Sequence, residues 1–365
     1  MSAQTAEMGT VRPERQKKKV VRRSAPDRSQ RMRRGVQLAF LALNAWIGAQ
    51  FFLWARQFEG TGQRLVVSRP PGVEGWLPIA GLMNLKYFAV TGRVPGIHPA
   101  AMFLLIAFLL MSLLLKKAFC SWLCPVGTLS ESLWKFGRRL FGRNFAVPRW
   151  LDRGLRSLKY ILLGLFVAVI GSMSAEALHD FMAGPYGIIA DVKMLEFFRT
   201  ISWVGITVLL ALGGLSLFIQ NFWCRYLCPY GALMGLVSVA SPVKIRRDQD
   251  ACIDCGKCAQ ACPARLKVDE LIQIRSVECS ACLACVAACP VENGLQFALP
   301  PRKSTETAAR WRARVLRPRT VAVVLAAIFL GAVLFARMTN HWQTRVPRDV
   351  YQQLVPHADA VSHPM

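Results

Sequence analysis

Long apolar runs alternate along the chain with polar segments rich in lysine and arginine. Five of the runs are long enough, or nearly long enough, to cross a hydrocarbon core of about 30 Å. They cover residues 36–54, 99–115, 158–173, 201–219 and 320–336. The pattern predicts a mainly α-helical fold, a polytopic membrane bundle of about five transmembrane helices. A sixth run, 76–90, contains Pro78, Asn84 and Lys86 and is too short and polar to span, so we expect it to be interfacial or re-entrant.

The basic residues indicate how the bundle is oriented. Residues 1–35 contain eleven lysines and arginines and the loop 116–157 contains nine, whereas the loop between the third and fourth runs contains only two. Because positively charged flanks are retained in the cytoplasm, we expect these two segments and residues 220–319 inside, and residues 337–365 outside. The formal net charge is +25, and the basic residues lie next to the apolar runs. This arrangement favours contact with anionic membrane lipid over nucleic-acid binding.

The strongest chemical signal is a pair of cysteine runs of the form C-x2-C-x2-C-x3-C-P. The cysteines are Cys252, Cys255, Cys258 and Cys262 in the first run and Cys279, Cys282, Cys285 and Cys289 in the second. Bacterial two-cluster ferredoxins have this spacing, and the fourth cysteine of each run ligates the other cluster. We therefore expect one [4Fe-4S] cluster on Cys252, Cys255, Cys258 and Cys289, and the other on Cys279, Cys282, Cys285 and Cys262. Zinc needs one tetrahedral set of four ligands and gives no reason for two identical runs.

A second repeated motif follows the second and fourth apolar runs. The sequence FCSWLCPVG at 119–127 recurs as WCRYLCPYG at 223–231. The motif cysteines are Cys120, Cys124, Cys224 and Cys228. Since both motifs follow inward crossings, we expect the four thiols to lie close together at the cytoplasmic face, as ligands of an additional metal centre or as redox-active thiols. The alternative interpretation is that they are small packing residues beside a proline-terminated helix end.

These features divide the chain into a membrane part and an inserted soluble part. The predicted divisions are a disordered basic cytoplasmic tail at 1–35, a membrane domain with four crossings at 36–240, a two-cluster ferredoxin-like α+β domain at 241–300, a basic linker at 301–319, the last transmembrane helix at 320–336 and a periplasmic tail at 337–365. Two clusters in one small domain, with no open ligand position, predict an electron relay rather than a substrate site.

The four motifs in this order resemble the membrane polyferredoxin family, which includes the NapH-type subunits of periplasmic nitrate reductase systems and the cysteine-rich half of NosR-type proteins. The matching features are CSWLCPVG and CRYLCPYG followed by the two ferredoxin runs, and the resemblance covers about residues 36–336. It implies electron transfer between the quinone pool and a redox enzyme or second iron-sulfur protein at the bacterial inner membrane. Unlike NosR-type proteins, the chain has no large domain before the first apolar run, so flavin is not expected. The short tail after the last crossing differs from the FixG-type oxidase-assembly proteins.

Other candidate sites carry less specific signals. His98 and His179 lie near the outer ends of adjacent crossings, but no second histidine pair stands across the membrane, so haem is not expected. In the run 76–90, Asn84, Lys86 and Tyr87 supply hydrogen-bond donors beside an apolar slot, which suggests a quinone site on the outer face. The same residues fit a packing loop equally well.

The function that the sequence favours is an electron conduit. Its helical part would meet quinol or quinone, and its ferredoxin-like part would pass electrons singly to a redox partner. Such a protein is an electron-transfer component with quinol dehydrogenase-type activity rather than a stand-alone enzyme, and no catalytic residue is assigned. The alternative is an assembly or maintenance factor that reduces a metal, such as copper, or a thiol in a membrane respiratory enzyme. A redox sensor is a third hypothesis.

Overall fold

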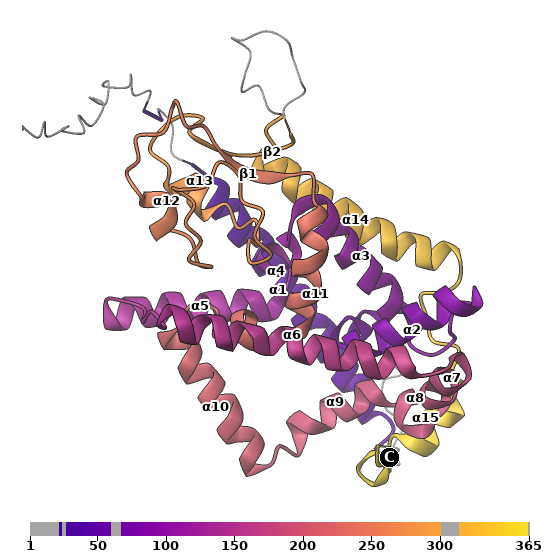
Figure 1. Ribbon diagram of the computed structural model, residues 1–365. Helices are drawn as coiled ribbons and strands as arrows, with labels where there is room; N and C mark the ends of the chain where they lie inside the picture. Colours follow the sequence, from indigo (N-terminus) through magenta and orange to yellow (C-terminus); the bar gives the residue numbers. More distant parts are fainter. Residues whose placement is uncertain (1–21, 24–26, 60–66, 301–313, 364–365) are drawn as a thin grey trace, which may run out of the picture.

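The computed structural model describes residues 22–23, 27–59, 67–300 and 314–363, and helices make up most of that part of the chain (Figure 1). Each of the five predicted apolar runs lies wholly or mostly in one helix. These are α1 (Ser29–Arg56), α3 (Pro99–Leu115), α6 (Arg149–Ser172), α10 (Trp203–Phe218) and α14 (Pro318–Met338). The sixth run forms the short helix α2 (Pro78–Thr91), which follows a 3-10 turn, η1 (Pro71–Trp76). The predicted mainly α-helical fold is confirmed.

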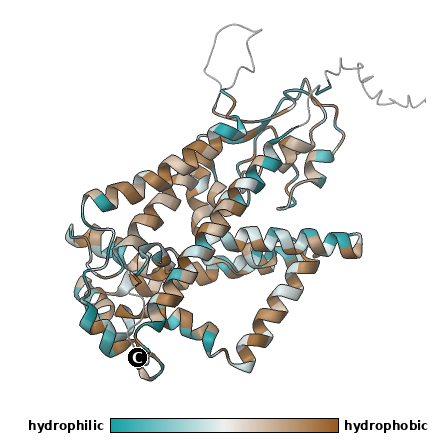
Figure 2. Ribbon diagram, turned by 180° about the vertical axis from the view of Figure 1, so that it is seen from behind, coloured by the Kyte–Doolittle hydropathy of each residue, from teal (hydrophilic) through white to brown (hydrophobic). Residues whose placement is uncertain are grey.

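Three helices in the described part of the chain are long and apolar enough to span a membrane, namely α1, α6 and α14. Helix α10 meets α9 (Ala190–Arg199) at a bend of 86°, and the two together form a fourth candidate span. Helix α3 has 17 residues, which is at the short end of what a bilayer requires. Five complete crossings therefore stay a prediction. Figure 2 shows long hydrophobic stretches on the helices and hydrophilic residues gathered near the C-terminus.

Helix α3 lies in the core of the helical part because it is apolar on every side. It packs against α2, α14 and α11 (Pro229–Val237). Its Met102 and Phe108 belong to the same buried cluster as Ile245 and Phe297, so that one core runs from the helices into the ferredoxin-like part. The short elements beside α3 and α10 are α4 (Ala118–Trp122), α5 (Pro125–Phe141), the π-helical turn η2 (Trp223–Leu227) and the 3-10 turn η3 (Ser238–Ala240).

The segment predicted as ferredoxin-like forms a two-stranded sheet and two short helices. Strands β1 (Lys244–Arg247) and β2 (Leu295–Ala298) pair antiparallel, with Ile245 opposite Phe297. Helices α12 (Lys257–Gln260) and α13 (Ala284–Ala288) pack against each other. After β2, Val315 forms a bridge with Ala298 and leads the chain into α14.

Helix α1 extends from the ferredoxin-like part to the opposite end of the molecule (Figure 1). It contacts α13, and near its end Trp54 packs edge-on against Tyr351 of α15 (Arg348–Leu354), with ring centroids 5.1 Å apart. The other short elements of this region are α7 (Ala175–Ala183), α8 (Pro185–Ile188) and η4 (Ala358–Ala360). The ferredoxin-like part and α15 therefore lie at opposite ends of one candidate membrane helix.

Two predicted boundaries differ from the structure. The expected disordered tail 1–35 is too long, because α1 begins at Ser29 and Arg22 forms a strand-like bridge with Val291. Polar contacts with the rest of the protein anchor the first turns of α1, and the apolar pattern gives no sign of them. Residues 1–21 lie outside the described residues, as do residues 301–313 of the expected linker. Helix α14 begins at Pro318, inside that linker.

Candidate iron-sulfur sites

The two ferredoxin runs fold into loops of the same conformation. Asp254 and Ala281, two residues after the first cysteine of each run, have φ angles of 54° and 49°. Gly256 and Leu283, at the next matched position, have φ angles of 67° and 58°. A left-handed backbone is uncommon for residues other than glycine, so its repetition at matched positions is informative. Successive backbone N–H groups around such positions form a concave nest that suits an anion, as in many iron-sulfur sites.

The fourth cysteine of each run lies beside cysteines of the other run. Burial raises the pKa of the Cys262 thiol to about 12, and the charge of Cys282 in the second run contributes to this rise. Burial also raises the pKa of Cys289, and the charges of Cys252 and Cys255 in the first run contribute in the same way. Each fourth cysteine is thus near thiols of the opposite run, the arrangement in which ligands are exchanged between two cubanes.

The two expected cysteine sets differ in burial. We call Cys262, Cys279, Cys282 and Cys285 the deep set and Cys252, Cys255, Cys258 and Cys289 the surface set. Cys279 and Cys285 are buried, whereas Cys255 is exposed. The two sets lie next to each other. Burial raises the pKa of Cys285 in the deep set, and the charge of Cys258 in the surface set adds to that rise. A centre in the surface set would be the one nearest to solvent.

The cysteines of the two C-x3-C-P motifs lie in short turns and at helix starts. Cys120 lies in α4 and Cys224 in the turn η2. Cys124 and Cys228 are the N-cap residues of α5 and α11, and in each case proline occupies the first helical position. Proline is well suited to that position and disfavours α conformation in the residue before it, so the motif sequence itself sets these helix starts.

Glycine is required at the end of the first motif. A Cβ atom on Gly127 would lie 2.2 Å from the carbonyl oxygen of Cys120, so a larger residue does not fit. In the second motif the Gly231 N–H donates to the Cys228 sulfur at 3.2 Å. Hydrogen bonds of this kind stabilise a thiolate. The proline and glycine of each motif therefore shape the turn that presents its sulfur atoms.

The four motif cysteines converge, and we call them the helix thiol group. Burial raises the pKa of Cys120 to about 12, and the charges of Cys124 and Cys228 contribute. The pKa of Cys224 is also raised, first by burial and then by the other three thiols. Within the described ranges no three His, Cys, Asp or Glu side chains surround a single metal-ion position. In a cubane each thiolate ligates a different iron, so convergence on one ion is not required.

A small cavity lies between the helix thiol group and the deep set. Cys120 and Cys224 line it on the helical side, and Cys282 lines it on the ferredoxin-like side. Lys117 is buried and also lines this cavity, as does Glu278. Burial would raise the pKa of Glu278, but the positive charge of Lys117 helps to hold it below its usual range. Burial raises the pKa of Cys120 and Cys224, and the positive charge of Lys117 opposes that rise. A cation beside buried thiols favours their deprotonated, metal-ligating form.

Residues between the cysteines of the first motif fasten the deep set to the helices. The Ser121 hydroxyl donates to the Ser280 carbonyl at 2.6 Å, and the Trp122 indole N–H donates to the Ala281 carbonyl at 3.1 Å. Both acceptors lie in the loop between Cys279 and Cys282. The sequence gives no sign of this role, because Ser121 and Trp122 stand in the motif as spacers and their acceptors are backbone groups.

The second motif is fastened by a buried ion pair. Arg225 donates through two nitrogens to Asp152 at 2.8 and 2.9 Å, and the Tyr226 hydroxyl donates to the same carboxylate at 2.6 Å. Arg225 also donates to the Ala264 carbonyl at 3.0 Å, beside the Cys262-Pro263 turn. Burial would raise the pKa of Asp152, but the hydrogen bonds of Arg225 and Tyr226 hold it below its usual range. The only sequence sign of this contact is a charged residue inside an otherwise apolar motif.

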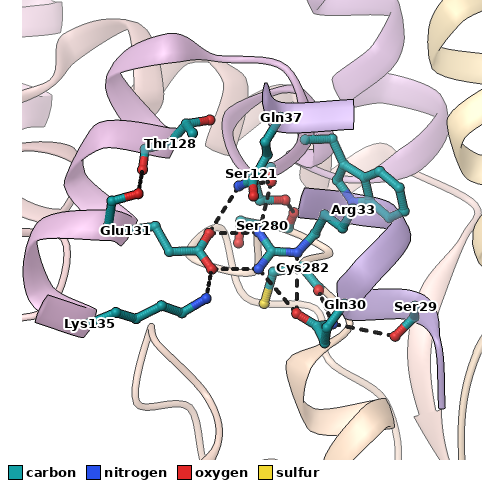
Figure 3. A network of polar contacts seen from close by, with 12 residues as sticks. Ser29, Gln30, Arg33, Gln37, Ser121, Thr128, Glu131, Lys135, Ser280 and Cys282 are labelled. Atoms are coloured by element: carbon teal, nitrogen blue, oxygen red, sulfur yellow. Dashed lines mark hydrogen bonds and ion pairs between the residues drawn. The ribbon is translucent and has the colours of Figure 1, made fainter. Parts of the chain in front are cut away.

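A second ion pair joins α1 to α5 beside the deep set (Figure 3). Arg33 donates to the two carboxylate oxygens of Glu131 at 2.7 and 2.5 Å and to the Ser121 carbonyl at 2.9 Å. Burial would raise the pKa of Glu131, but the ion pair with Arg33 holds it down at about 2. Gln30 donates to the Cys282 carbonyl at 2.9 Å. The start of α1 is thereby tied to a loop of the deep set.

The two histidines singled out by the sequence have different surroundings. His98 is buried, with Nε2 2.9 Å from the Gly187 carbonyl oxygen and Nδ1 3.2 Å from a guanidinium nitrogen of Arg69. His179 is exposed, and its ring centroid is 6.0 Å from that of Tyr87. Both ring nitrogens of His98 are thus engaged by protein groups.

The polar residues of the run 76–90 bond to nearby backbone. Asn84 donates to the carbonyls of Ile97 and His98, each at 2.9 Å. Lys86 donates to carbonyls at the end of α6, including those of Ile170 and Gly171 at 2.8 Å. These contacts favour the packing interpretation of the segment, and a quinone site built on its polar residues stays a prediction.

Models of two protein families match this chain. One described as "4Fe-4S binding domain" matches residues 97–144 and again residues 201–248, so each match contains one C-x3-C-P motif. The other, described as "4Fe-4S dicluster domain", matches residues 244–290, which contain both ferredoxin runs. Together with the candidate membrane helices, these matches define a ferredoxin-type 4Fe-4S electron transport protein.

One relative matched over most of the chain, and two matched over about half of it, identify the family. YccM of Escherichia coli (strain K12), which is named as a candidate electron transport protein, is 50% identical over 334 residues, or 91% of this chain and 91% of that protein. Protein NirI of Paracoccus denitrificans (strain Pd 1222) is 33% identical over 47% of this chain and 24% of NirI. Ferredoxin-type protein NapH of Haemophilus influenzae (strain ATCC 51907 / DSM 11121 / KW20 / Rd) is 28% identical over 50% of this chain and 63% of NapH. The chain belongs to the membrane polyferredoxin-type family, as its motifs predict. No solved structure matches it.

Proposed function

We propose that the protein relays electrons between the quinone pool of a bacterial inner membrane and a redox partner. The observation that carries the proposal is that three groups of cysteines follow one another from the helical part to the surface. The helix thiol group adjoins the cavity lined by Cys282 of the deep set. The deep set adjoins the surface set, in which Cys255 is exposed to solvent. A row of redox centres that ends at the surface suits electron exchange with a second protein.

The deep set and the surface set are each proposed to ligate one [4Fe-4S] cluster. Two observations support the fit of these residues to clusters. The loops have matching left-handed positions that turn backbone N–H groups toward an anion, and the fourth cysteine of each run lies among thiols of the other. A cluster bound in each set would supply a centre that takes up and gives back one electron at a time.

The helix thiol group is proposed to ligate a third centre of the same kind. Each match to the 4Fe-4S binding domain includes one half of this group. Lys117 supplies a buried positive charge next to it, and buried thiolates require such compensation. The donor set and its charge therefore favour a ligand role over packing.

The amino terminus and the ferredoxin-like part are proposed to lie in the cytoplasm, and the C-terminal helix α15 in the periplasm. The course of α1 supports placing the ferredoxin-like part and α15 on opposite sides of the membrane. This candidate span contacts α13 of the ferredoxin-like part and, near its end, Tyr351 of α15. The lysine and arginine bias supports the assignment of the ferredoxin-like end to the cytoplasm.

The test is to purify the protein in detergent, count its iron and mix it rapidly with a quinol. Two clusters correspond to about eight irons per chain and three to about twelve. A quinol gives up two electrons and two protons, and we expect the electrons to enter the protein in succession while the protons pass to water. Bleaching of the visible absorbance would report this reduction.

The matched variant is Cys120→Ser with Cys224→Ser. We expect it to retain about eight irons that dithionite still reduces, and to lose reduction by quinol. A wild-type iron content near eight, with full quinol-dependent reduction in all four single Cys→Ser variants of the helix thiol group, would return these cysteines to the packing interpretation. Wild-type clusters that dithionite reduces but no quinol reduces would contradict the quinone relay.

A further inference from the structure

A large apolar cleft lies between α2, α6 and the start of α11. Its volume is about 500 Å³, within the range of small-molecule sites. Ile79 and Leu82 of α2 and Leu162 and Phe166 of α6 line its walls. None of the described residues that line the cleft is charged. It is therefore suited to an apolar ligand with a neutral polar group, and unsuited to the charged head group of a phospholipid.

One end of the cleft meets the helix thiol group. Cys228 and Tyr230 both line it there. The Tyr230 ring stands edge-on to Phe108 and Phe119, with centroids 6.4 and 6.5 Å apart, and its hydroxyl makes no hydrogen bond with a described residue. The phenolic hydroxyl of a tyrosine is neutral at neutral pH and can donate one hydrogen bond. Leaving such a donor unpaired in apolar surroundings costs free energy, and a ligand oxygen that accepts a hydrogen bond from it offsets that cost.

The cleft is elongated along α6. Leu162 and Ile170 both line it, and eight residues of α-helix correspond to a rise of about 12 Å. Helix α6 is a candidate membrane span, so this length of the cleft lies along a helix that a bilayer would surround. A lipid-soluble molecule could therefore enter from the membrane and reach the thiol end with its polar group.

We propose that this cleft binds an isoprenoid quinone or its quinol, with the head ring beside Tyr230 and Cys228 and the tail along α6 and α2. A quinone is neutral, its carbonyl oxygens accept hydrogen bonds and its tail is apolar, and the cleft favours these three properties together. The inference rests on the proposed electron relay and adds the place at which the quinone pool is met. It differs from the site suggested by the sequence, because α2 contributes Ile79 and Leu82 rather than its polar residues.

The test is equilibrium dialysis of decylubiquinone against the full chain in detergent. Leu162→Trp fills the cleft and is expected to weaken binding about tenfold or more. Tyr230→Phe keeps the ring but removes the donor, and is expected to weaken binding about threefold to tenfold. The matched control is Leu165→Trp on the same helix, at a position that is 57% exposed and does not line the cleft. We expect it to bind like the wild type.

Iron content and reduction by dithionite, equal in all four proteins, would show that each is folded and loaded. Equal binding of decylubiquinone by all four would overturn the cleft as the site, while reduction of their clusters by decylubiquinol would leave the relay standing. Binding with the expected order, in protein whose clusters no quinol reduces, would support the site and contradict the relay. Phospholipid that remains bound and that decylubiquinone cannot displace would overturn the inference.

Discussion

The ferredoxin-like part and the helical part both bring cysteines together, but by different means. In the ferredoxin-like part the two ligand loops are close in sequence, and each has the same left-handed positions, at Asp254 and Gly256 in one and at Ala281 and Leu283 in the other. In the helical part each motif only sets the start of a helix. The two halves of the helix thiol group meet because α11 packs against both α3 and α6.

The two parts are therefore expected to respond differently to mutation. In the ferredoxin-like part the local backbone largely defines each site, so loss of one ligand should affect one cluster. In the helical part the site depends on contacts between distant elements, such as that of Arg225 with Asp152 and that of Arg33 with Glu131. Removing those contacts should displace the helix thiol group from the deep set without changing any cysteine.

The largest effect is expected from the ferredoxin ligands themselves. Cys258→Ser and Cys289→Ser should remove the same cluster, about four irons, because the fourth ligand is exchanged between the runs. Electron paramagnetic resonance of dithionite-reduced protein should show the same signal lost in both variants. Cys285→Ser is the matched control at the equivalent position of the second run, and it should remove the other signal. If Cys289→Ser instead loses the signal that Cys285→Ser loses, each run ligates its own cluster.

The next largest effect is expected at Arg225. Arg225→Ala would leave the buried Asp152 carboxylate with only part of its compensation and remove the bond to the Ala264 carbonyl, at a cost of about 3 to 5 kcal/mol. Arg153→Ala, on the exposed side of α6, is the control and should cost less than about 0.5 kcal/mol. Thermal unfolding in detergent would measure both. Equal stability of the two variants would mean that the second motif is not fastened by this pair.

Features set by neighbouring residues could be predicted from the sequence, whereas features set by contacts between distant segments could not. The helix over residues 99–115 was predictable to the residue, because an apolar run bounded by proline and lysine sets its own ends. The cysteine spacing also predicts the two ferredoxin ligand sets, and they stay a prediction. The first turns of α1 were not predictable, because Gln30 and Arg33 are polar residues whose partners lie far along the chain. The fastening role of Ser121 was hidden too, because a backbone carbonyl acceptor leaves no mark in a sequence. The partner of Arg225 was hidden because Asp152 lies 73 residues away along the chain.

A smaller effect, dependent on pH, is expected at Glu131. Its pKa is about 2 in the folded protein against an ordinary value of 4.5, so the folded state binds fewer protons and is stabilised above pH 4.5. That contribution, about 3 kcal/mol, should be lost as the pH falls from 4.5 toward 2. The difference in unfolding free energy between the wild type and Glu131→Gln, measured in mixed micelles, should therefore shrink with acid. Lys135→Ala removes the half-exposed partner of the same carboxylate and should cost only about 0.5 kcal/mol. A difference that does not change with pH would mean that the carboxylate is not paired as described.

The smallest effect is expected at Ser121, and it separates the two motifs most directly. Ser121→Ala removes one neutral hydrogen bond to the Ser280 carbonyl and should cost about 1 kcal/mol, well below the cost at Arg225. The loop of the deep set would still be fastened by the Trp122 bond to the Ala281 carbonyl. Both cluster signals of the ferredoxin-like part should therefore persist, while hydrogen exchange at residues 280–282 should become faster. Ser132→Ala, which removes a hydroxyl bonded only within α5, is the control and should leave that exchange unchanged. Unchanged exchange in Ser121→Ala as well would show that the Ser121 hydroxyl does not fasten the loop.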